Sequence, residues 1–531
     1  MRKVTKILVS TLSVIILTVL GLILTLTILL EIPAFQNFIV HKATEFVSDM
    51  LGTKVAIGRV RLKFISRAEL QDVYIEDLHG DTLAYVGRLE AGIRNLGLKG
   101  GAIELGEVKL DRTRFYMHQV QMGDTITSNL GEILAKLQSD EPKEKKGGFA
   151  LRAASVSVED LAYRYRKLET DAREGVNFSD VEVGRLDLSA DAFSIVGDSI
   201  ALKINRAYIK ESKSGFTVDD FSAAQVLVSS GAVHLKELHI KTPDSELSAD
   251  YIELTGDSWK SYSAFVDSVD MQASFDIKRF SYATVAYFAP GLGDWKSVYR
   301  DVQGKVSGTV AAMRGEVARM RTLDTSLDGV RFDIAGLPDV PRTRFRFDIG
   351  SLQTNAADAL WLFSDITRGQ LPENTRTMLM RLGDVSFKGH FDGTLARFTA
   401  NGDLATSRGN AGVNLAFTPQ TGGLTHIDGH LNVVNFEVGK LIDSPALGRA
   451  SVKGEVKGLL GGGTVAMDAD ARLGLLEFND YAYHDVDMKG RFENRNFTGQ
   501  VASGDPNIHF DFDGQLDMND SVPRYDFRLA L

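Results

Sequence analysis

The chain of 531 residues contains no cysteine, which excludes disulfide bonds, thiolate metal ligands and thiol nucleophiles. Proline is also scarce, with 11 residues, whereas glycine is plentiful, with 50. Because proline interrupts the hydrogen-bonded ladder of a sheet, this balance favours a chain of many paired strands. The 60 basic and 70 acidic residues give a net charge of −10, and an acidic chain is not expected to bind nucleic acid.

One long segment lacks charge altogether and is strongly apolar, from Ile7 to Leu30. Its 24 residues are long enough, as a helix, to cross a hydrocarbon layer of about 30 Å. A cleaved signal peptide is the alternative. The apolar region of signal peptides has only about 7–15 residues and ends in a cleavage site of small residues. Residues 30–33 do not form such a cleavage site. The basic residues precede the segment, so we expect a single-pass anchor with a cytoplasmic N-terminus. The predicted anchor residues are Ile7, Leu8, Ile15, Ile16, Leu17, Leu20, Leu22, Leu24 and Leu30.

An amphipathic helix is predicted next, over 31–52. Its apolar residues recur with a period near 3.6: Phe35, Phe38, Ile39, Phe46, Val47 and Met50. Two interpretations stay open. The helix either caps a sheet or lies at the membrane surface where the anchor emerges.

Beyond Gly52 the dominant pattern has period two, which places apolar side chains on one face of a sheet and polar ones on the other. Short turn signals such as His79-Gly80-Asp81 separate the strands, so we expect antiparallel pairing. The charged, glycine-containing stretch 139–148 predicts a flexible linker between an N-terminal β unit, 53–138, and an extended β region, 149–531. Helical insertions are expected near 282–288 and 355–382. These helices are too few to cover the sheet, so its apolar face must pack on another layer or bind something apolar.

A loose repeat, apolar-x-Gly-x-apolar, recurs with glycine at positions 308, 389, 429, 454, 490 and 514. Each glycine is expected on the apolar face, where it lets the sheet curve or leaves room for something other than a side chain. The uneven spacing fits one long sheet of repeated hairpins better than a strict solenoid. Glycine bulges in ordinary β-sandwiches are the alternative.

No constellation for catalysis is recognisable. His426 and His430 lie four residues apart in a predicted strand, about 13 Å, which is too far for one zinc ion. Asp511-x-Asp513-Gly514 lacks the remaining ligands of a calcium loop, so we place both aspartates on the wet face of a strand. We predict no enzyme activity, no cofactor and no metal.

Several segments resemble AsmA-like proteins, most closely the TamB (translocation and assembly module) family in its Bacteroidota form: LGTKVAIG at 51–58, LQDVYIED at 70–77, GDTLAY at 80–85, LHIKTPDSE at 238–246, YFAP at 287–290, LPEN at 371–374 and DVSFKGHF at 384–391. The resemblance implies an inner-membrane protein of a Gram-negative bacterium with a long periplasmic β-groove, acting in phospholipid transport and outer-membrane protein biogenesis. Family members are usually longer and engage an outer-membrane barrel through a C-terminal domain. We expect that region to be missing here, since the sequence stops at Leu531 inside an alternating pattern.

The sequence thus predicts a mainly β protein: a transmembrane helix, then an elongated, curved antiparallel β-sheet groove with a few short amphipathic helices. The groove is predicted to shield phospholipid acyl chains on their way toward the outer membrane. Two alternatives remain, a scaffold for assembling outer-membrane β-barrels or secreting autotransporters and a spacer of ordinary sandwich domains. The predicted groove-lining residues are Val60, Leu62, Phe64, Val73, Ile75, Val306, Val310, Phe387, Phe391, Val452, Val456 and Phe512.

Overall fold

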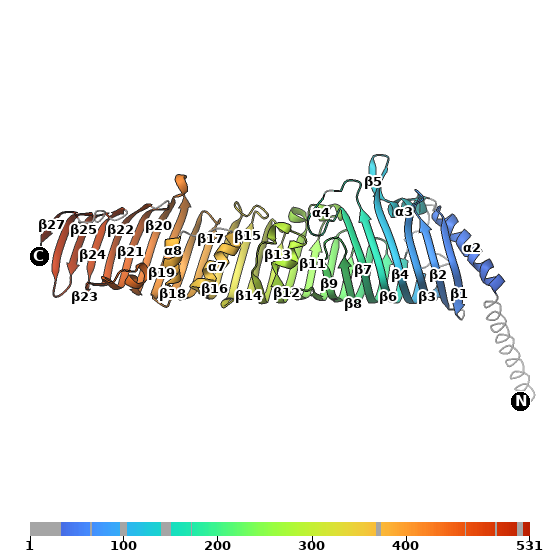
Figure 1. Cartoon of the computed structure of the whole chain (residues 1–531), viewed down its shortest axis with the longest axis horizontal. Coiled ribbons are helices and arrows are strands. Elements are labelled where there is room, and N and C mark those ends of the chain that lie inside the picture. The colour runs from blue at the N-terminus through green and yellow to red at the C-terminus, as the bar shows by residue number, and fades with distance from the viewer. Residues whose placement is uncertain are drawn as a thin grey trace, which may run out of the picture. The chain divides into compact units, whose positions relative to one another are not determined.

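A computed structural model describes residues 33–63, 66–95, 103–139, 150–170, 172–367, 373–461, 464–493, 496–517 and 524–530. The predicted anchor, 7–30, and most of the predicted linker, 139–148, lie outside these residues. The chain is mainly β, as predicted. It divides into two compact units, an N-terminal unit of Met1–Glu246 with Ala283–Gly293, and a C-terminal unit of Leu247–Tyr282 with Asp294–Leu531. Figure 1 shows strands standing side by side in each unit.

The N-terminal unit contains two longer helices, a short helix and ten strands. Its elements are α2 (Pro33–Leu51), β1 (Val55–Lys63), β2 (Arg67–Glu76), β3 (Thr82–Asn95), β4 (Ile103–Met122), β5 (Thr125–Ser128), α3 (Asn129–Ser139), β6 (Ala150–Arg166), β7 (Asp180–Val196), β8 (Ser199–Glu211), β9 (Thr217–Val228), β10 (Ala232–Lys241) and the 3-10 helix η1 (Pro290–Leu292). Helix α2 packs against β1, the first strand of the ladder. The helix therefore caps the sheet.

The C-terminal unit continues in the same style. Its elements are β11 (Glu246–Thr255), α4 (Trp259–Ser263), α5 (Phe265–Ser268), β12 (Asp270–Ser281), α6 (Tyr282–Ala286), β13 (Val298–Gly308), β14 (Ala312–Thr322), β15 (Thr325–Ala335), β16 (Arg344–Asn355), α7 (Ala356–Thr367), α8 (Glu373–Met380), β17 (Asp384–Gly393), β18 (Phe398–Thr406), β19 (Gly409–Pro419), η2 (Thr421–Gly423), β20 (Thr425–Glu437), α9 (Val438–Ile442), β21 (Leu447–Gly461), β22 (Thr464–Phe478), β23 (Tyr481–Tyr483), β24 (Val486–Glu493), β25 (Asn496–Gly504), β26 (His509–Asp517) and β27 (Arg524–Ala530). Two of these elements are divided between the units, since Glu246 of β11 and all of α6 except Tyr282 belong to the N-terminal unit.

Within each unit, neighbouring strands of the sequence pair as antiparallel hairpins, from β12 to β22 and from β24 to β27 in the C-terminal unit. One pair departs from the expected antiparallel pattern: β4 and β6 run parallel. The chain between them forms β5 and α3 before it re-enters the sheet. A parallel pair requires such a crossover, and the short turn signals of the sequence did not reveal it.

A row of residues in the left-handed backbone conformation, which we call the left-handed row, crosses the N-terminal unit and breaks the simple alternation. Asp72, Arg112 and Asp160 have positive φ angles of 54°, 51° and 53°, and the register sets Asp72 beside Gly58 of β1 and Gly87 of β3. A Cβ on Gly58 would lie 3.0 Å from the Cβ of Asp72, so a larger residue at position 58 would crowd Asp72. Val60 pairs with Leu70, three residues before Val73, yet Val60 and Val73 are both buried, so the alternation reverses at Asp72.

Hydrogen bonds offset the strain of this row. The Tyr85 hydroxyl donates to Asp72 at 2.7 Å, and Arg114 donates to the backbone carbonyl and a carboxylate oxygen of Asp160 at 2.8 and 2.9 Å. The next strand continues the chain of contacts, since the Asp160 N–H donates to Asp187 at 2.9 Å. Holding a non-glycine residue at positive φ costs about 1–3 kcal/mol, which bonds of this kind can repay.

In the C-terminal unit the register keeps whole rows of apolar residues in line across consecutive strands. One such row, from β13 to β22, consists of Val306, Gly315, Phe332, Phe347, Phe391, Ala400, Leu415, Gly429, Val456 and Ala469. Another, from β16 to β24, consists of Leu352, Phe387, Leu404, Ala411, Val433, Val452, Leu473 and Val486. At about 4.8 Å per strand, the fifteen strands of β12–β22 and β24–β27 carry the apolar face over roughly 65 Å.

The two ends of these strands are finished differently, and we name them the helix rim and the turn rim. At the helix rim, α7, α8 and α9 fill the connections after β16 and β20. Asp358 of α7 accepts the N–H of Asp324 at 2.8 Å, and Asp365 accepts the N–H of Ser297 at 3.1 Å, which pins α7 across the ends of β13–β15. The turn rim has the connections 309–311, 336–343, 394–397 and 420–424, touched by α5 through a 3.0 Å bond from Ala311 N–H to the Val266 carbonyl.

The glycines of the apolar face make room for phenylalanine rings. This corrects the interpretation in which these glycines leave room for something other than a side chain. A Cβ on Gly389 would lie 2.7 Å from Cζ of Phe387, and one on Gly315 would lie 2.7 Å from Cζ of Phe332. The same holds for Gly490 beneath the ring of Phe497. The space left by these glycines is therefore filled by a side chain of the protein itself, an arrangement that protects an otherwise open backbone.

We expect Gly389→Ala to destabilise the C-terminal unit by about 1–3 kcal/mol, because the added methyl meets the ring of Phe387 and the carbonyl oxygen of Asn401. Gly474→Ala is the matched control, since a Cβ there meets nothing within 4 Å. Thermal unfolding of the full chain, followed by circular dichroism, measures the difference. Equal stability of the two variants would contradict ring-over-glycine packing.

Candidate functional site

The apolar face of the C-terminal unit is the main candidate for a functional surface. Of the residues predicted to line a groove, Val306, Phe391 and Val456 fall in one register row, Phe387 and Val452 share a second, and Phe512 lies on the same face. All six are half-buried, neither sealed in a core nor open to solvent. In this unit no described strand packs extensively on a strand that is not its ladder neighbour, so no second sheet covers the face.

Other predicted lining residues fare differently. Val60 and Val73 are buried, at 6% and 8% exposure, and Ile75 is half-buried. For Leu62 the structure gives only its place in β1, and Phe64 lies outside the described residues. Val310 was expected on a strand, but β13 ends at Gly308, whose φ is +102°, and Val310 lies in the turn.

Aromatic rings gather on the apolar face near the turn rim. Phe347 and Phe391 lie 6.2 Å apart, Phe391 and Phe398 are stacked at 4.8 Å, and Phe398 and Phe417 are stacked at 4.5 Å. A second series runs Phe492, Phe497, Phe512 and Phe527 at 4.8, 6.3 and 5.2 Å. Each series crosses four strands, so large apolar side chains line the part of the face that no helix of the helix rim reaches.

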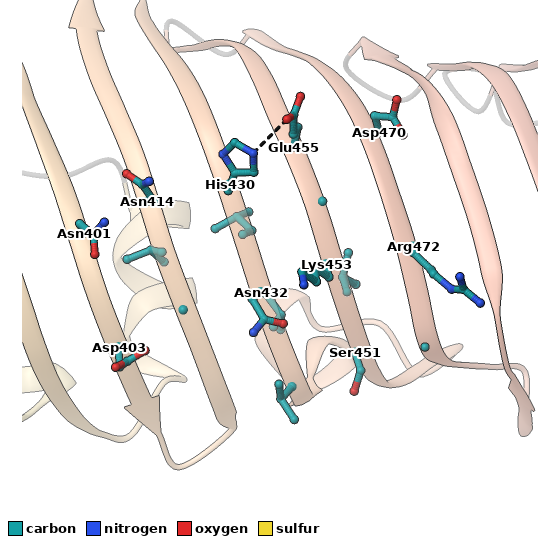
Figure 2. Close-up of a pocket in the computed structure, with 18 of the residues that line it drawn as sticks. Asn401, Asp403, Asn414, His430, Asn432, Ser451, Lys453, Glu455, Asp470 and Arg472 are labelled. Carbon is teal, nitrogen blue, oxygen red and sulfur yellow. Dashed lines mark ion pairs between the residues drawn. The ribbon is translucent and has the colours of Figure 1, made fainter.

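The opposite face is polar and locally hollowed. Figure 2 shows one hollow, of about 980 Å³, over β18–β22. Alternating side chains line it, with Asn401, Asn414 and His430 in one register row that continues to Glu455. His430 Nε2 lies 2.9 Å from the Glu455 carboxylate.

A buried polar cluster holds α3 on the N-terminal unit. Asp77 and Asn129 are 1% and 0% exposed. The Asp77 carboxylate accepts from the N–H groups of His79 and Asp81, both at 2.9 Å, and from Asn129 Nδ2 at 3.1 Å. Burial opposes ionisation of Asp77, but these hydrogen bonds outweigh it and hold its pKa below the ordinary value of 3.8.

The same cluster offers three metal-ligating groups, Asp77, Asp81 and His118, whose ligand atoms lie within 4.8 Å of one another. The hydrogen bonds of Asn129 determine which ring nitrogen of His118 carries the proton. Its Oδ1 accepts the N–H groups of His118 and Leu130 at 3.2 and 3.0 Å, so its Nδ2 faces His118 Nδ1 at 3.2 Å as a donor. The proton of a neutral His118 is then on Nε2, the atom that faces Asp77 at 3.7 Å, so a metal ion would have to displace this proton to bind there. The cluster acts as a structural latch between a turn, a strand and a helix.

No family model, curated protein or solved structure matches the chain. Among the described residues, no helix is both long and apolar enough to span a membrane.

Sequence patterns missed the latch and the left-handed row for different reasons. Asn129 and Asp77 are 52 positions apart, and only the tertiary contact gives them meaning. For the left-handed row a signal did exist, because Gly58, Gly87 and Asp72 each interrupt an alternating run. Glycine inside a strand pattern is a known sign of a close backbone approach.

We expect Asn129→Ala to weaken the docking of α3 by about 1–3 kcal/mol at neutral pH, because a buried carboxylate loses a donor. Because the pKa of Asp77 is lower in the folded than in the unfolded protein, the ionised carboxylate stabilises the fold above the unfolded pKa, and this contribution is lost as the pH falls through the folded pKa. The difference in the stability of α3 docking between wild type and variant should therefore narrow below about pH 3.8. Hydrogen exchange at the amides of α3 measures it. Asn410→Ala, at an exposed position, is the control. A difference between wild type and Asn129→Ala that does not change with pH would contradict the latch.

Proposed function

We propose that the chain is an envelope lipid-transfer protein of the AsmA-like, TamB type, which offers its apolar sheet face to phospholipid acyl chains. The observation that carries the proposal is the half-buried apolar face of the C-terminal unit, in line across fifteen strands and covered by no second sheet. An antiparallel sheet with one apolar face needs an apolar partner. The sequence resemblance supports the same conclusion.

The energetics favour such a face as a path. Exposing a methylene to water costs about 0.8 kcal/mol, so moving an acyl chain of about fourteen methylenes through water costs roughly 11 kcal/mol. Along rows that repeat every 4.8 Å or so, the chain exchanges one apolar contact for another. The face lowers the barrier and gives no direction to the movement, so the proposed mechanism is passive.

The proposal places the protein in the inner membrane of a Gram-negative bacterium, with 7–30 as a single anchor and the sheet in the periplasm. Its partners are phospholipids, the inner membrane and, as the family resemblance implies, an outer-membrane barrel. A scaffold for outer-membrane barrel assembly or autotransporter secretion is the second candidate. It is favoured by the outer edge of β27, which pairs with no described strand and offers backbone groups to an incoming strand.

Photo-crosslinking residues on the two faces test the lipid proposal directly. Probes at Phe391, Val452 and Val456 should capture phospholipid in cells that express the full chain, because these side chains lie on the apolar face. Probes at Lys388 and Lys453, one or three residues away in the same strands, lie on the polar face and should not. Mass spectrometry of the adducts identifies the lipid. Equal labelling of the faces, or none, would refute the proposal.

A charge on the apolar face separates transport from scaffolding. We expect Phe391→Asp and Val456→Asp to fold, at a cost of about 1–3 kcal/mol, because both sites are half-buried and the carboxylate can reach water. A sealed core would not tolerate an unpaired charge. The variants should show normal abundance and β-type circular dichroism, with impaired lipid homeostasis.

Lys388→Asp and Lys453→Asp are the matched controls on the polar face. Loss of the fold in the apolar-face variants would indicate a closed core. Full activity in lipid homeostasis and in barrel assembly, with the fold intact, would count against the conduit, because a scaffold that pairs backbone groups tolerates the charge.

A further inference from the structure

The turn rim around β16–β18 is amphipathic within single strands. At the start of β16, Phe345 and Phe347 belong to the apolar face, while Arg344 and Arg346 alternate with them on the polar face. The hairpin of β17 and β18 repeats the arrangement, with Phe391 and Phe398 on the apolar face and Arg397 in the connecting turn. Large rings and guanidinium groups thus meet along one edge.

The arginines outnumber the acids at this edge. Asp392 accepts from Arg344 at 2.8 and 3.0 Å and from Arg346 at 3.3 Å, so one carboxylate serves two guanidinium groups. Arg397 is exposed and makes no ion pair with a described residue. Asp333 of β15 faces Arg346 across the strand pair, so three arginines and two aspartates leave a net charge of +1 on a short stretch of rim.

The register places two of these arginines around one turn. Phe345 pairs with Gly393, and continuing by one residue sets Arg344 beside Thr394. The N–H of Thr394 donates to the carbonyl of Arg397 at 2.8 Å, so Thr394 lies between the two arginines, each about 5 Å away in backbone spacing. The Thr394 hydroxyl serves the turn itself, since it accepts the N–H of Arg397 at 3.1 Å and donates to the Arg397 carbonyl at 3.4 Å. Neighbouring guanidinium groups are what a phosphate group binds.

We propose that Arg344 and Arg397 bind the phosphate of a phospholipid whose acyl chains lie on the adjoining ring-lined face. This inference rests on the proposed function and adds an orientation: headgroups leave the sheet at the turn rim. Arginine reaches around a strand end because its apolar stem lies along the protein while its head stays in water. The helix rim is unsuited to the task, since α7 crosses the strand ends there and Asp324, Asp358 and Asp365 place carboxylates along it.

The test compares two lipids with identical tails. The full chain is incubated with phosphatidylcholine vesicles that contain either phosphatidylglycerol or diacylglycerol, each with a photoreactive group in the tail. We expect the wild-type protein to capture phosphatidylglycerol about tenfold more than diacylglycerol. Arg344→Gln with Arg397→Gln should remove this preference and leave the capture of diacylglycerol unchanged. Asp392 keeps its bond to Arg346 in that variant, so the turn stays folded.

Lys388→Gln is the control, because Lys388 is an exposed polar-face residue away from the rim that makes no ion pair with a described residue. Equal capture of the two lipids by the wild type, or an unchanged preference in the arginine variant, would overturn the phosphate site and leave the lipid-binding face standing. Capture of neither lipid would instead contradict the proposed function. If inorganic phosphate abolishes the preference at equal concentration, the site binds free phosphate and the inference fails.

Discussion

Cross-strand register is the constraint on which the C-terminal unit depends. In an antiparallel sheet, a slip of one residue moves every apolar side chain of a strand to the wrong face. The rows through Phe391 and through Phe387 persist over many strands because each hairpin keeps its register to its neighbour. Where the register shifts, as between Val433 and Phe436, the shift lies near the helix rim, and the rows nearer the turn rim remain unbroken.

The N-terminal unit obtains the same result by a different route. Asp72, Arg112 and Asp160 hold the left-handed conformation at one level of the sheet, with Gly87 between Asp72 and Arg112. A reversal of the alternation in one strand alone would put the two halves of that strand on different faces from its neighbours. Reversals at one level preserve one apolar face, and Gly58 and Gly87 leave room for the side chains of Asp72 and Arg112. Buried Val60 and Val73, on either side of the row, are its consequence.

How much of this was predictable follows from the range of each interaction. Period-two alternation is local, so the sheet, its polar and apolar faces and the place of Phe387, Phe391, Val452 and Val456 on the apolar face could be read from the sequence. The parallel pair of β4 and β6 could not, because nothing local distinguishes a crossover from a long hairpin loop. Val310 was misplaced because a glycine can continue a strand or end it, and Gly308 ends it with a positive φ. The arginine pair at the turn rim could not be predicted either, because Arg344 and Arg397 are far apart in sequence and only the folded sheet brings them to one turn.

The rings over the glycines bear on what the apolar face can accept. Because Phe332 and Phe387 fill the hollows above Gly315 and Gly389, the face is closed on itself at those points in the absence of a partner, and an incoming acyl chain must either lie over the rings or turn them aside. A ring turned aside loses contacts with the backbone beneath it and gains contacts with the chain, so the exchange is nearly neutral in apolar area. In the proposed lipid path, such a face would hold an acyl chain with similar strength at every row. A passive path requires this property, since a tight site would trap the molecule that the proposal has it pass on.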